Sequence, residues 1–106
     1  MNLFHLRYFE TLARTEHYSK AAEILSITQP SLSYAISTLE SELGIQLFEK
    51  RGRNIVLTKY GKAFYSNVKE ILANLDNAVR DIKLVANGEG EINLGFLRTL
   101  GTDYVP

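Results

Sequence analysis

The strongest constraint on the fold is an apolar stripe in the segment ITQPSLSYAISTLESELG, residues 27–44. The stripe consists of Leu32, Ile36, Leu39 and Leu43. Because successive members are four or three residues apart, they fall on one face of a helix, and that face is expected to be buried. Thr28 suits the N-cap, Pro30 suits the first turn, and Gly44 suits the position after the last turn. These signals predict a helix over residues 28–43.

Two further helices are predicted before this segment. Ser19 can cap the short segment KAAEILS, in which Ala21 and Ala22 are small enough for a neighbouring helix to approach closely. An earlier helix is indicated by apolar residues at helical spacing, namely Leu3, Leu6, Phe9, Leu12 and Ala13. Two helices joined by a tight turn, the second opening with polar residues, are typical of a helix-turn-helix.

After the third predicted helix, the spacing changes to short apolar runs. Leu47 and the run 55–57 flank a polar turn at residues 50–54, and this arrangement predicts a small β-hairpin, or wing. Thr58 can then cap another helix that extends to about Ala86. A helix of about 28 residues is about 42 Å long, which is more than a domain of this size needs.

The long helix carries a heptad pattern, which is typical of helices that pair with a second helix. The apolar members of the pattern are Phe64, Val68, Ile71, Leu75, Ala78, Ile82 and Val85. Phe64 is expected to pack on the chain's own core, and Val68 can also contribute there. The residues predicted to contact a second copy in a dimer are Val68, Ile71, Leu75, Ala78, Ile82 and Val85.

The formal net charge is zero at pH 7, but the charges are unevenly distributed. Residues 1–49 carry three basic and six acidic side chains, and residues 70–106 carry the same numbers. Residues 50–69, the basic block, carry six basic side chains and no acidic one. Because salt screens exposed charges beyond about 10 Å, this local excess matters more than the total. The basic block can therefore attract a polyanion, although a merely solvated basic surface is the alternative interpretation.

Few features of the sequence indicate catalysis, metal binding or a membrane location. The chain has no cysteine, and His5 and His17 lack the spacing of metal ligands. No base is set against a nucleophile, so we expect neither an enzyme nor a cofactor site in this segment. No leader-like segment opens the chain and no apolar run approaches twenty residues. A cytoplasmic location without membrane contact is therefore expected.

The motifs AAxxL, TQPSLS, LESELGIQLFEK and LTxxG, in this order, resemble the N-terminal region of LysR-type bacterial transcriptional regulators. The resemblance covers residues 1 to about 87. It implies a mostly α fold, with a winged helix-turn-helix of three helices and a β-hairpin over residues 1–58 and a dimerisation helix over residues 59–87. Residues 88–106 resemble a hinge and the start of the family's effector-binding domain. The chain would then be a fragment of a protein that senses a small-molecule effector of unknown identity.

The resemblance also implies sequence-specific binding of a homodimer to double-stranded DNA at an inverted repeat, and it suggests a tetramer for the intact protein. The helix over residues 28–43 would enter the major groove, and the wing would touch the flanking backbone or minor groove. Matched to the family pattern, the contacts fall on Gln29, Pro30, Ser31, Ser33, Tyr34 and Arg53. Residue chemistry and proximity along the chain extend this DNA-binding set to Ser19, Thr28, Ser37, Thr38, Lys50 and Arg51.

Tyr34 departs from the family pattern, in which a basic residue often stands at this position. Guanine readout by an arginine of this helix is therefore not expected, whereas a tyrosine can donate a hydrogen bond to a phosphate or pack on a thymine methyl group. Electrostatic attraction would then come mainly from the basic block. The alternative function is a protein-interaction module, in which the winged domain is a scaffold and the paired long helices make the contact.

Overall fold

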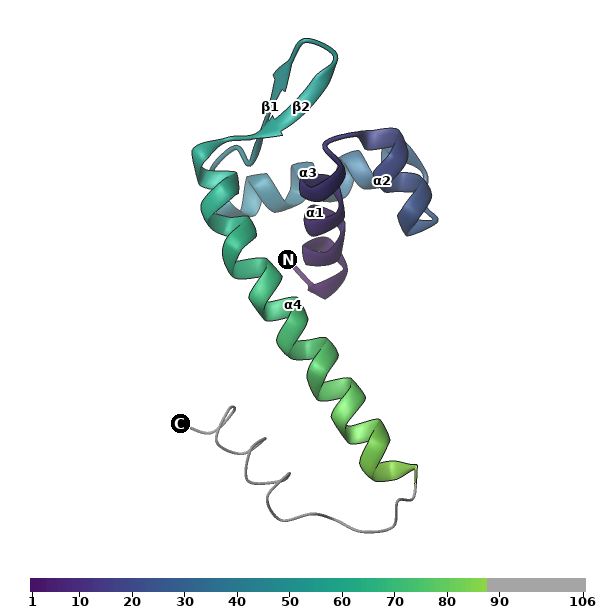
Figure 1. The fold of residues 1–106 in the computed structure, drawn as a ribbon. Helices are drawn as coiled ribbons and strands as arrows, with labels where there is room; N and C mark the ends of the chain where they lie inside the picture. Colours follow the sequence, from purple (N-terminus) through teal and green to yellow (C-terminus); the bar gives the residue numbers. More distant parts are fainter. Residues whose placement is uncertain (88–106) are drawn as a thin grey trace. The chain divides into compact units, whose positions relative to one another are not determined.

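The computed structural model describes residues 1–87, which form four α-helices and one two-stranded sheet (Figure 1). The elements are α1 (Leu3–Thr15), α2 (Tyr18–Leu25), α3 (Gln29–Leu43), β1 (Phe48–Arg51), β2 (Asn54–Leu57) and α4 (Lys59–Ala86). The predicted winged helix-turn-helix followed by a long helix is thus confirmed. Met1–Leu72 form one compact unit, and Ala73 begins a second one. The expected hinge and effector-domain start at residues 88–106 lie outside the described residues.

Helix α3 begins and ends where its sequence signals place it. The Thr28 side chain accepts a hydrogen bond from the Ser31 backbone N–H, Pro30 occupies the first turn, and Gly44 closes the helix with a φ of 72°. For α2 the expected cap was wrong. The helix begins at Tyr18 and is capped by the His17 side chain, which accepts from the Lys20 backbone N–H. Ser19 is therefore inside the first turn of α2.

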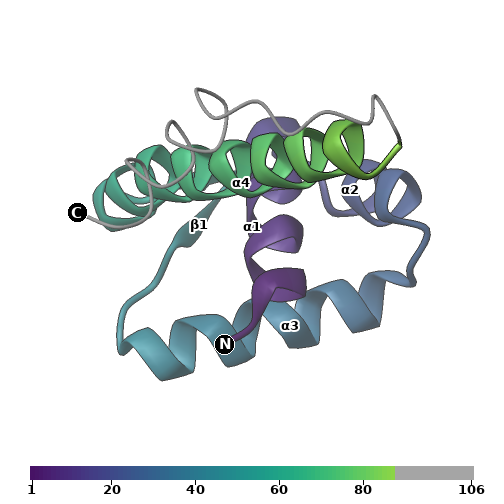
Figure 2. The ribbon, with the colours of Figure 1, turned by 90° about the horizontal axis from the view of Figure 1, so that it is seen from below.

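The core of the first unit is built around α1. Phe9 has no exposed surface, and its ring lies 5.5 Å from the Phe48 ring and 5.1 Å from the Phe64 ring. In Figure 2, α1 lies between α3 and α4, so it brings α3 and the start of α4 onto one core. The stripe on α3 is buried as predicted at Leu32, Ile36 and Leu39, and Leu43 packs against the same core from a half-buried position.

The wing is an antiparallel hairpin in which Phe48 pairs with Leu57 and Arg51 pairs with Asn54. Gly52 sits in the turn with a φ of 64°, a conformation that glycine adopts without a steric penalty. At its base, the hairpin is tied to α3, because the Glu40 carboxylate accepts hydrogen bonds from the backbone N–H groups of Leu47 and Phe48, at 2.7 and 3.3 Å. The base of the wing is therefore fixed to α3.

A close backbone contact joins the start of α4 to the loop before β1. A Cβ atom placed on Gly61 would lie 2.1 Å from the Leu47 carbonyl oxygen and 2.9 Å from a Leu57 side-chain carbon. The Thr58 backbone N–H donates to the same carbonyl oxygen at 2.9 Å. Glycine is required here because any side chain would push the first turn of α4 away from the base of the wing.

The apolar residues of α4 are buried up to Leu72 at the positions that face the core, and are more exposed after it. Val68 is completely buried and Leu72 is 6% exposed, so both belong to the core of the first unit. The expectation that Val68 contacts a partner was therefore wrong, because no surface of its side chain is left for a partner to cover. Beyond Leu72, the exposed fractions are 42% for Val79, 54% for Ile82 and 55% for Leu84. Within the described residues, no helix is long and apolar enough to cross a membrane.

Candidate nucleic-acid interface

One side of α3 is exposed and carries no charge. The exposed face of α3 consists of Pro30, Ser33, Tyr34 and Ser37. Tyr34 is 75% exposed, the highest value among the large apolar or aromatic residues that remain on the surface. Thr38 is half-buried, and Ala35 is 4% exposed on the core side. The face therefore offers hydroxyl groups and one aromatic ring, which can make hydrogen bonds and apolar contacts but no ion pair.

The first turn of α3 uses most of its own hydrogen-bonding groups. The Thr28 hydroxyl accepts from the Ser31 backbone N–H at 3.2 Å and donates to the Ser31 hydroxyl oxygen at 2.8 Å. The Leu32 N–H donates to the Thr28 carbonyl, and Pro30 has no N–H to offer. Few backbone donors are thus left for a phosphate at this helix start. Thr28 therefore has a structural role as the N-cap of α3, independent of any contact with DNA.

Gln29 connects α3 to α2. Its side-chain Nε2 donates a hydrogen bond to the Ser19 hydroxyl oxygen at 2.8 Å. A small hollow beside this bond is lined by both residues and also by Tyr18 and by Arg53 of the wing. Partial burial, and to a lesser degree the Glu40 carboxylate, raise the pKa of Tyr18, so its phenol is neutral at physiological pH. Three segments that are distant in sequence thus place an amide, a hydroxyl and a guanidinium around one hollow, together with the carboxylate of Glu16.

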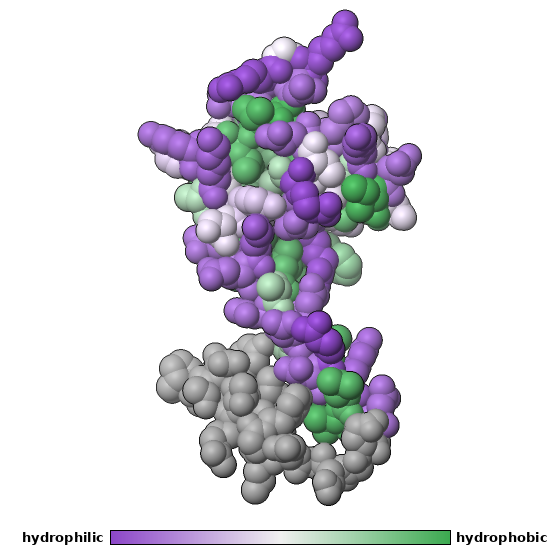
Figure 3. All heavy atoms as spheres, viewed as in Figure 1, coloured by the Kyte–Doolittle hydropathy of each residue, from purple (hydrophilic) through white to green (hydrophobic). Residues whose placement is uncertain are grey.

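The basic side chains of the wing point into solvent. Lys50, Arg51 and Arg53 are all exposed, and within residues 1–87 no ion pair is formed by any of them. Figure 3 shows hydrophilic side chains extending from the tip of the hairpin, above a patch of hydrophobic residues drawn in green. At the start of α4, the Lys59 ammonium lies 5.1 Å from the centre of the Tyr60 ring. The basic block is therefore free to meet an anion along both elements.

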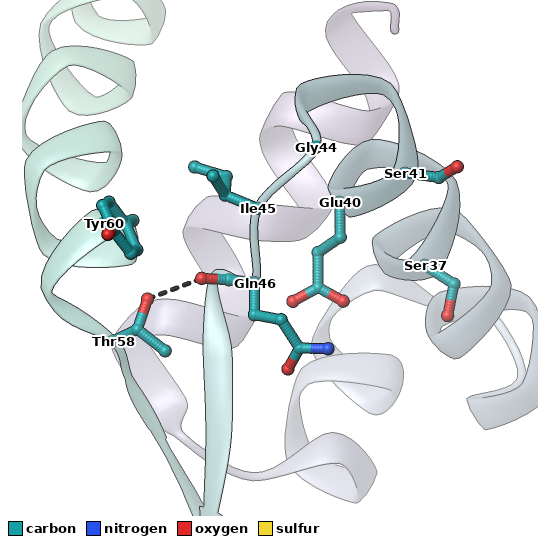
Figure 4. A pocket seen from close by; sticks show the side chains of 8 residues that line it. All are labelled: Ser37, Glu40, Ser41, Gly44, Ile45, Gln46, Thr58 and Tyr60. Carbon is teal, nitrogen blue, oxygen red and sulfur yellow. Dashed lines mark hydrogen bonds between the residues drawn. The ribbon is translucent and has the colours of Figure 1, made fainter.

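A groove that the sequence did not reveal lies between the second half of α3 and the start of α4 (Figure 4). Its lining consists of Ser37, Glu40, Ser41, Gly44, Ile45, Gln46, Thr58 and Tyr60. The Thr58 hydroxyl, the N-cap of α4, donates to the Gln46 carbonyl oxygen at 2.6 Å across the loop. The only carboxylate in this lining belongs to Glu40, which already holds two backbone N–H groups. The groove borders the exposed face of α3 at Ser37.

The structure thus brings most of the predicted DNA-binding residues to the surface, in two groups. Ser19, Gln29 and the exposed face of α3 form one group, and the tip of the wing forms the other, with Arg53 between them at the hollow. Gly61 is the glycine of the LTxxG motif, but the motif did not show its close contact with the Leu47 carbonyl oxygen, and Val79 was not singled out in the sequence. A glycine at the third position of a helix and an apolar residue next to Ala78 were visible in the sequence.

Known proteins with similar sequences are transcriptional regulators. The family described as bacterial regulatory helix-turn-helix proteins, lysR family, matches residues 3–62. The uncharacterized regulator YybE of Bacillus subtilis is 46% identical over 102 residues, which is 95% of this chain and 35% of YybE. The regulator BenM of Acinetobacter baylyi is 42% identical over the full chain and 35% of its own length. The chain thus spans about a third of the length of these relatives.

Solved structures with the same fold include complexes with DNA. A BenM DNA-binding domain bound to a catB site superposes with a TM-score of 0.79 and 43% identity, covering 83% of this chain and 98% of that one. An OxyR protein of Corynebacterium glutamicum gives a TM-score of 0.73 at 38% identity, covering 77% of this chain and 26% of that one. The likeness extends through the helices and the wing that carry the exposed groups described above.

Proposed function

The chain belongs to the lysR family of bacterial regulatory helix-turn-helix proteins, and from this premise we propose that it binds double-stranded DNA sequence-specifically, as a homodimer, to regulate transcription. The observation that carries this proposal is the pairing of an uncharged, exposed α3 face with an exposed basic wing, on a fold that in BenM is seen bound to DNA. Helix α3 would lie in the major groove and the wing on the flanking backbone or minor groove.

The two groups of residues would have different tasks. Gln29 can form two hydrogen bonds with the N6 and N7 edge of an adenine, and Ser33, Ser37 and Tyr34 can reach neighbouring base edges or phosphates. The hydroxyls of Ser31 and Thr38 stand at the margin of this contact. Lys50, Arg51 and Arg53 would neutralise phosphates, which gives affinity without sequence preference.

The second half of α4 supports the dimer. Val68 is buried in the core and is no longer counted among the predicted contact residues. The heptad positions that remain are Ile71, Leu75, Ala78, Ile82 and Val85. Ile71 and Ile82 are 47% and 54% exposed, and Val79 beside them is 42% exposed. Exposed apolar residues at this spacing are covered when a second helix packs on them. A two-fold dimer would bind inverted half-sites separated by one helical turn or a multiple of it.

For the intact protein we propose a cytoplasmic, non-enzymatic regulator that responds to a small-molecule effector and can assemble into a tetramer. The relatives are named as regulators of transcription, and the chain covers only about a third of them. The effector would be held by the part of the protein that follows α4.

Selection of binding sites from random duplexes tests the proposed function. The 106-residue chain should enrich an inverted repeat, and its affinity for that site should fall steeply with salt. If the dimer neutralises about six phosphates, the log–log slope is expected to be about −5. A slope near zero, or no enriched sequence, would contradict DNA binding and favour a protein-interaction module.

The dimer can be tested by sedimentation with a matched pair of variants. Ile82→Asp together with Leu75→Asp should dissociate the dimer, because two charges would be buried in an apolar contact. Leu84→Asp is the control, since Leu84 is 55% exposed, much as Ile82 is, but lies about half a helical turn away from Ile82. A double variant that stays dimeric would refute the proposed seam.

A further inference from the structure

We propose that Ser19 is a positioning residue: its hydroxyl holds the Gln29 amide in the orientation that reads a base, and links that base contact to a phosphate contact. This inference rests on the proposed DNA binding and deepens it. The observation behind it is the 2.8 Å hydrogen bond from Gln29 Nε2 to Ser19 Oγ. The bond joins the first residue of α3 to the second residue of α2.

The geometry of the amide determines what Gln29 can still do. A glutamine amide has two N–H donors and one carbonyl acceptor, and Ser19 occupies only one of the donors. The second N–H and Oε1 remain available, and they lie side by side when Ser19 accepts from the N–H that points away from Oε1. An adenine presents an acceptor at N7 and a donor at N6 in the major groove, so the two free groups match that edge.

The bond also removes a cost of recognition. Gln29 is exposed, and a free glutamine side chain samples several rotamers that it must give up on contacting a base. With Nε2 held by Ser19, part of this freedom is lost before DNA arrives. Preorganisation of this kind increases affinity for the matching base without any new contact.

Ser19 can contribute a second interaction with its own proton. Its oxygen accepts from Gln29, so the hydroxyl hydrogen is free to donate. Arg53 lines the same hollow and can attract an anionic phosphate oxygen, against the repulsion of Glu16, whose carboxylate group belongs to the same lining. The phosphate, Ser19, Gln29 and the base would then form one continuous chain of hydrogen bonds, so that the backbone contact fixes the base-reading group.

The first test needs no DNA. In the free 106-residue chain, Ser19→Ala should shift the side-chain NH₂ resonances of Gln29 in an NMR spectrum, and Ser19→Thr should largely keep them, because it keeps the hydroxyl. Ser41→Ala, on the exposed second half of α3, is the matched control and should leave them unchanged. If Ser19→Ala has no effect on these resonances, the hydrogen bond does not hold the amide, and the proposal is overturned.

The second test measures base preference on the duplex selected by the unaltered chain, and on its versions with each base pair replaced. Ser19→Ala should reduce the preference about three- to tenfold at the base pair that Gln29 reads, and leave preferences at the other pairs unchanged. Ser19→Thr should restore it. In the Gln29→Ala background, Ser19→Ala should weaken binding to all duplexes equally.

Three outcomes would overturn the inference, and they are distinguishable from one another. Ser19→Ala with full preference means that the bond is incidental. An equal loss of preference in both backgrounds means that Ser19 reads a base itself. An unaltered chain with no sequence preference refutes the proposed function as well, and it is detected before any variant is compared.

Discussion

The exposed face of α3 and the basic wing are neighbouring surfaces that differ in charge: the face is uncharged and the wing is positively charged. The first has no charged side chain and ends in short hydroxyls around Tyr34, whereas the second exposes Lys50, Arg51 and Arg53. On DNA, phosphate contacts supply attraction and register, and base contacts supply sequence preference. Under the proposed function, the contrast predicts that the two tasks fall on different elements of this chain, while many DNA-binding helices combine them by placing arginine or lysine on the reading surface.

The two surfaces also differ in how firmly they are held. Helix α3 is anchored along its length by Leu32, Ile36 and Leu39, all at most 2% exposed. The wing is a single hairpin in which Phe48 is buried at the base, while Ile55 is buried one residue pair from the turn. An isolated hairpin is only marginally stable, so the tip has more freedom than the helix. A base edge requires precise placement, but a phosphate tolerates variation, so the firmer support is where precision is needed.

Gly61→Ala should have the largest effect, because it disturbs the support that both surfaces share. The new methyl group would collide with the Leu47 carbonyl oxygen, and we expect a loss of about 3 kcal/mol of unfolding free energy. Urea denaturation measures this loss, and binding to selected and random DNA should weaken together. Gly52→Ala is the matched control: nothing lies within 4 Å of its Cβ position, and its positive φ alone should cost about 1–2 kcal/mol. Equal losses for the two variants would show that the structure around Gly61 can relax.

Gln29→Ala should separate reading from attraction. We expect a loss of about 1–3 kcal/mol on the selected duplex and little change on random DNA, because the Gln29 amide is expected to bind a base edge. Fluorescence anisotropy with both duplexes measures the difference. A similar loss of affinity for both duplexes would mean that Gln29 contacts DNA without regard to sequence, as the wing residues are expected to do. It would contradict the prediction that Gln29 reads a base.

Arg53→Ala should show the complementary behaviour. Affinity is expected to fall on selected and random DNA alike, and the salt slope should become shallower by about 1 for each phosphate that the variant no longer neutralises. Arg80→Ala, which removes an exposed arginine from the second half of α4, should leave the slope unchanged. If Arg53→Ala changes base preference but keeps the slope, the arginine reads the minor groove instead of neutralising the backbone.

How much could be predicted from the sequence depends on whether a feature is local. The start of α3 at Thr28 and its end at Gly44 follow from residues within a few positions, and both were predicted correctly. The cap of α2 was assigned to Ser19, a better capping residue than His17, but Tyr18 packs against the core and extends the helix by one residue before Ser19. Tertiary packing decided that position, and no local pattern reports it.

The same distinction applies to the candidate site. The DNA-binding set was predicted from residue types and from the family pattern, and its contacts with DNA stay a prediction. What the sequence could not indicate is that Gln29 and Ser19, ten positions apart, are hydrogen-bonded, or that the Gly61 backbone touches Leu47. The heptad pattern likewise continues through Val68 without a break, although the core ends after Leu72. Each of these facts requires the relative placement of two helices or of a helix and a loop.

Tyr34→Arg should have the smallest effect on the preferred site and is the most direct test of the contrast between the two surfaces. At 75% exposure the substitution should change the unfolding free energy by no more than about 0.5 kcal/mol. An arginine on the exposed face of α3 would add attraction where the chain has none. Binding to random DNA should therefore strengthen, with a salt slope steeper by about 1, while the preference at the facing base pair should shift toward guanine. Phe4→Arg, which adds the same charge at a 68% exposed aromatic position on α1, should change the slope less. Identical slopes for Tyr34→Arg and the unaltered chain would mean that this face does not approach DNA, and that the wing alone accounts for binding.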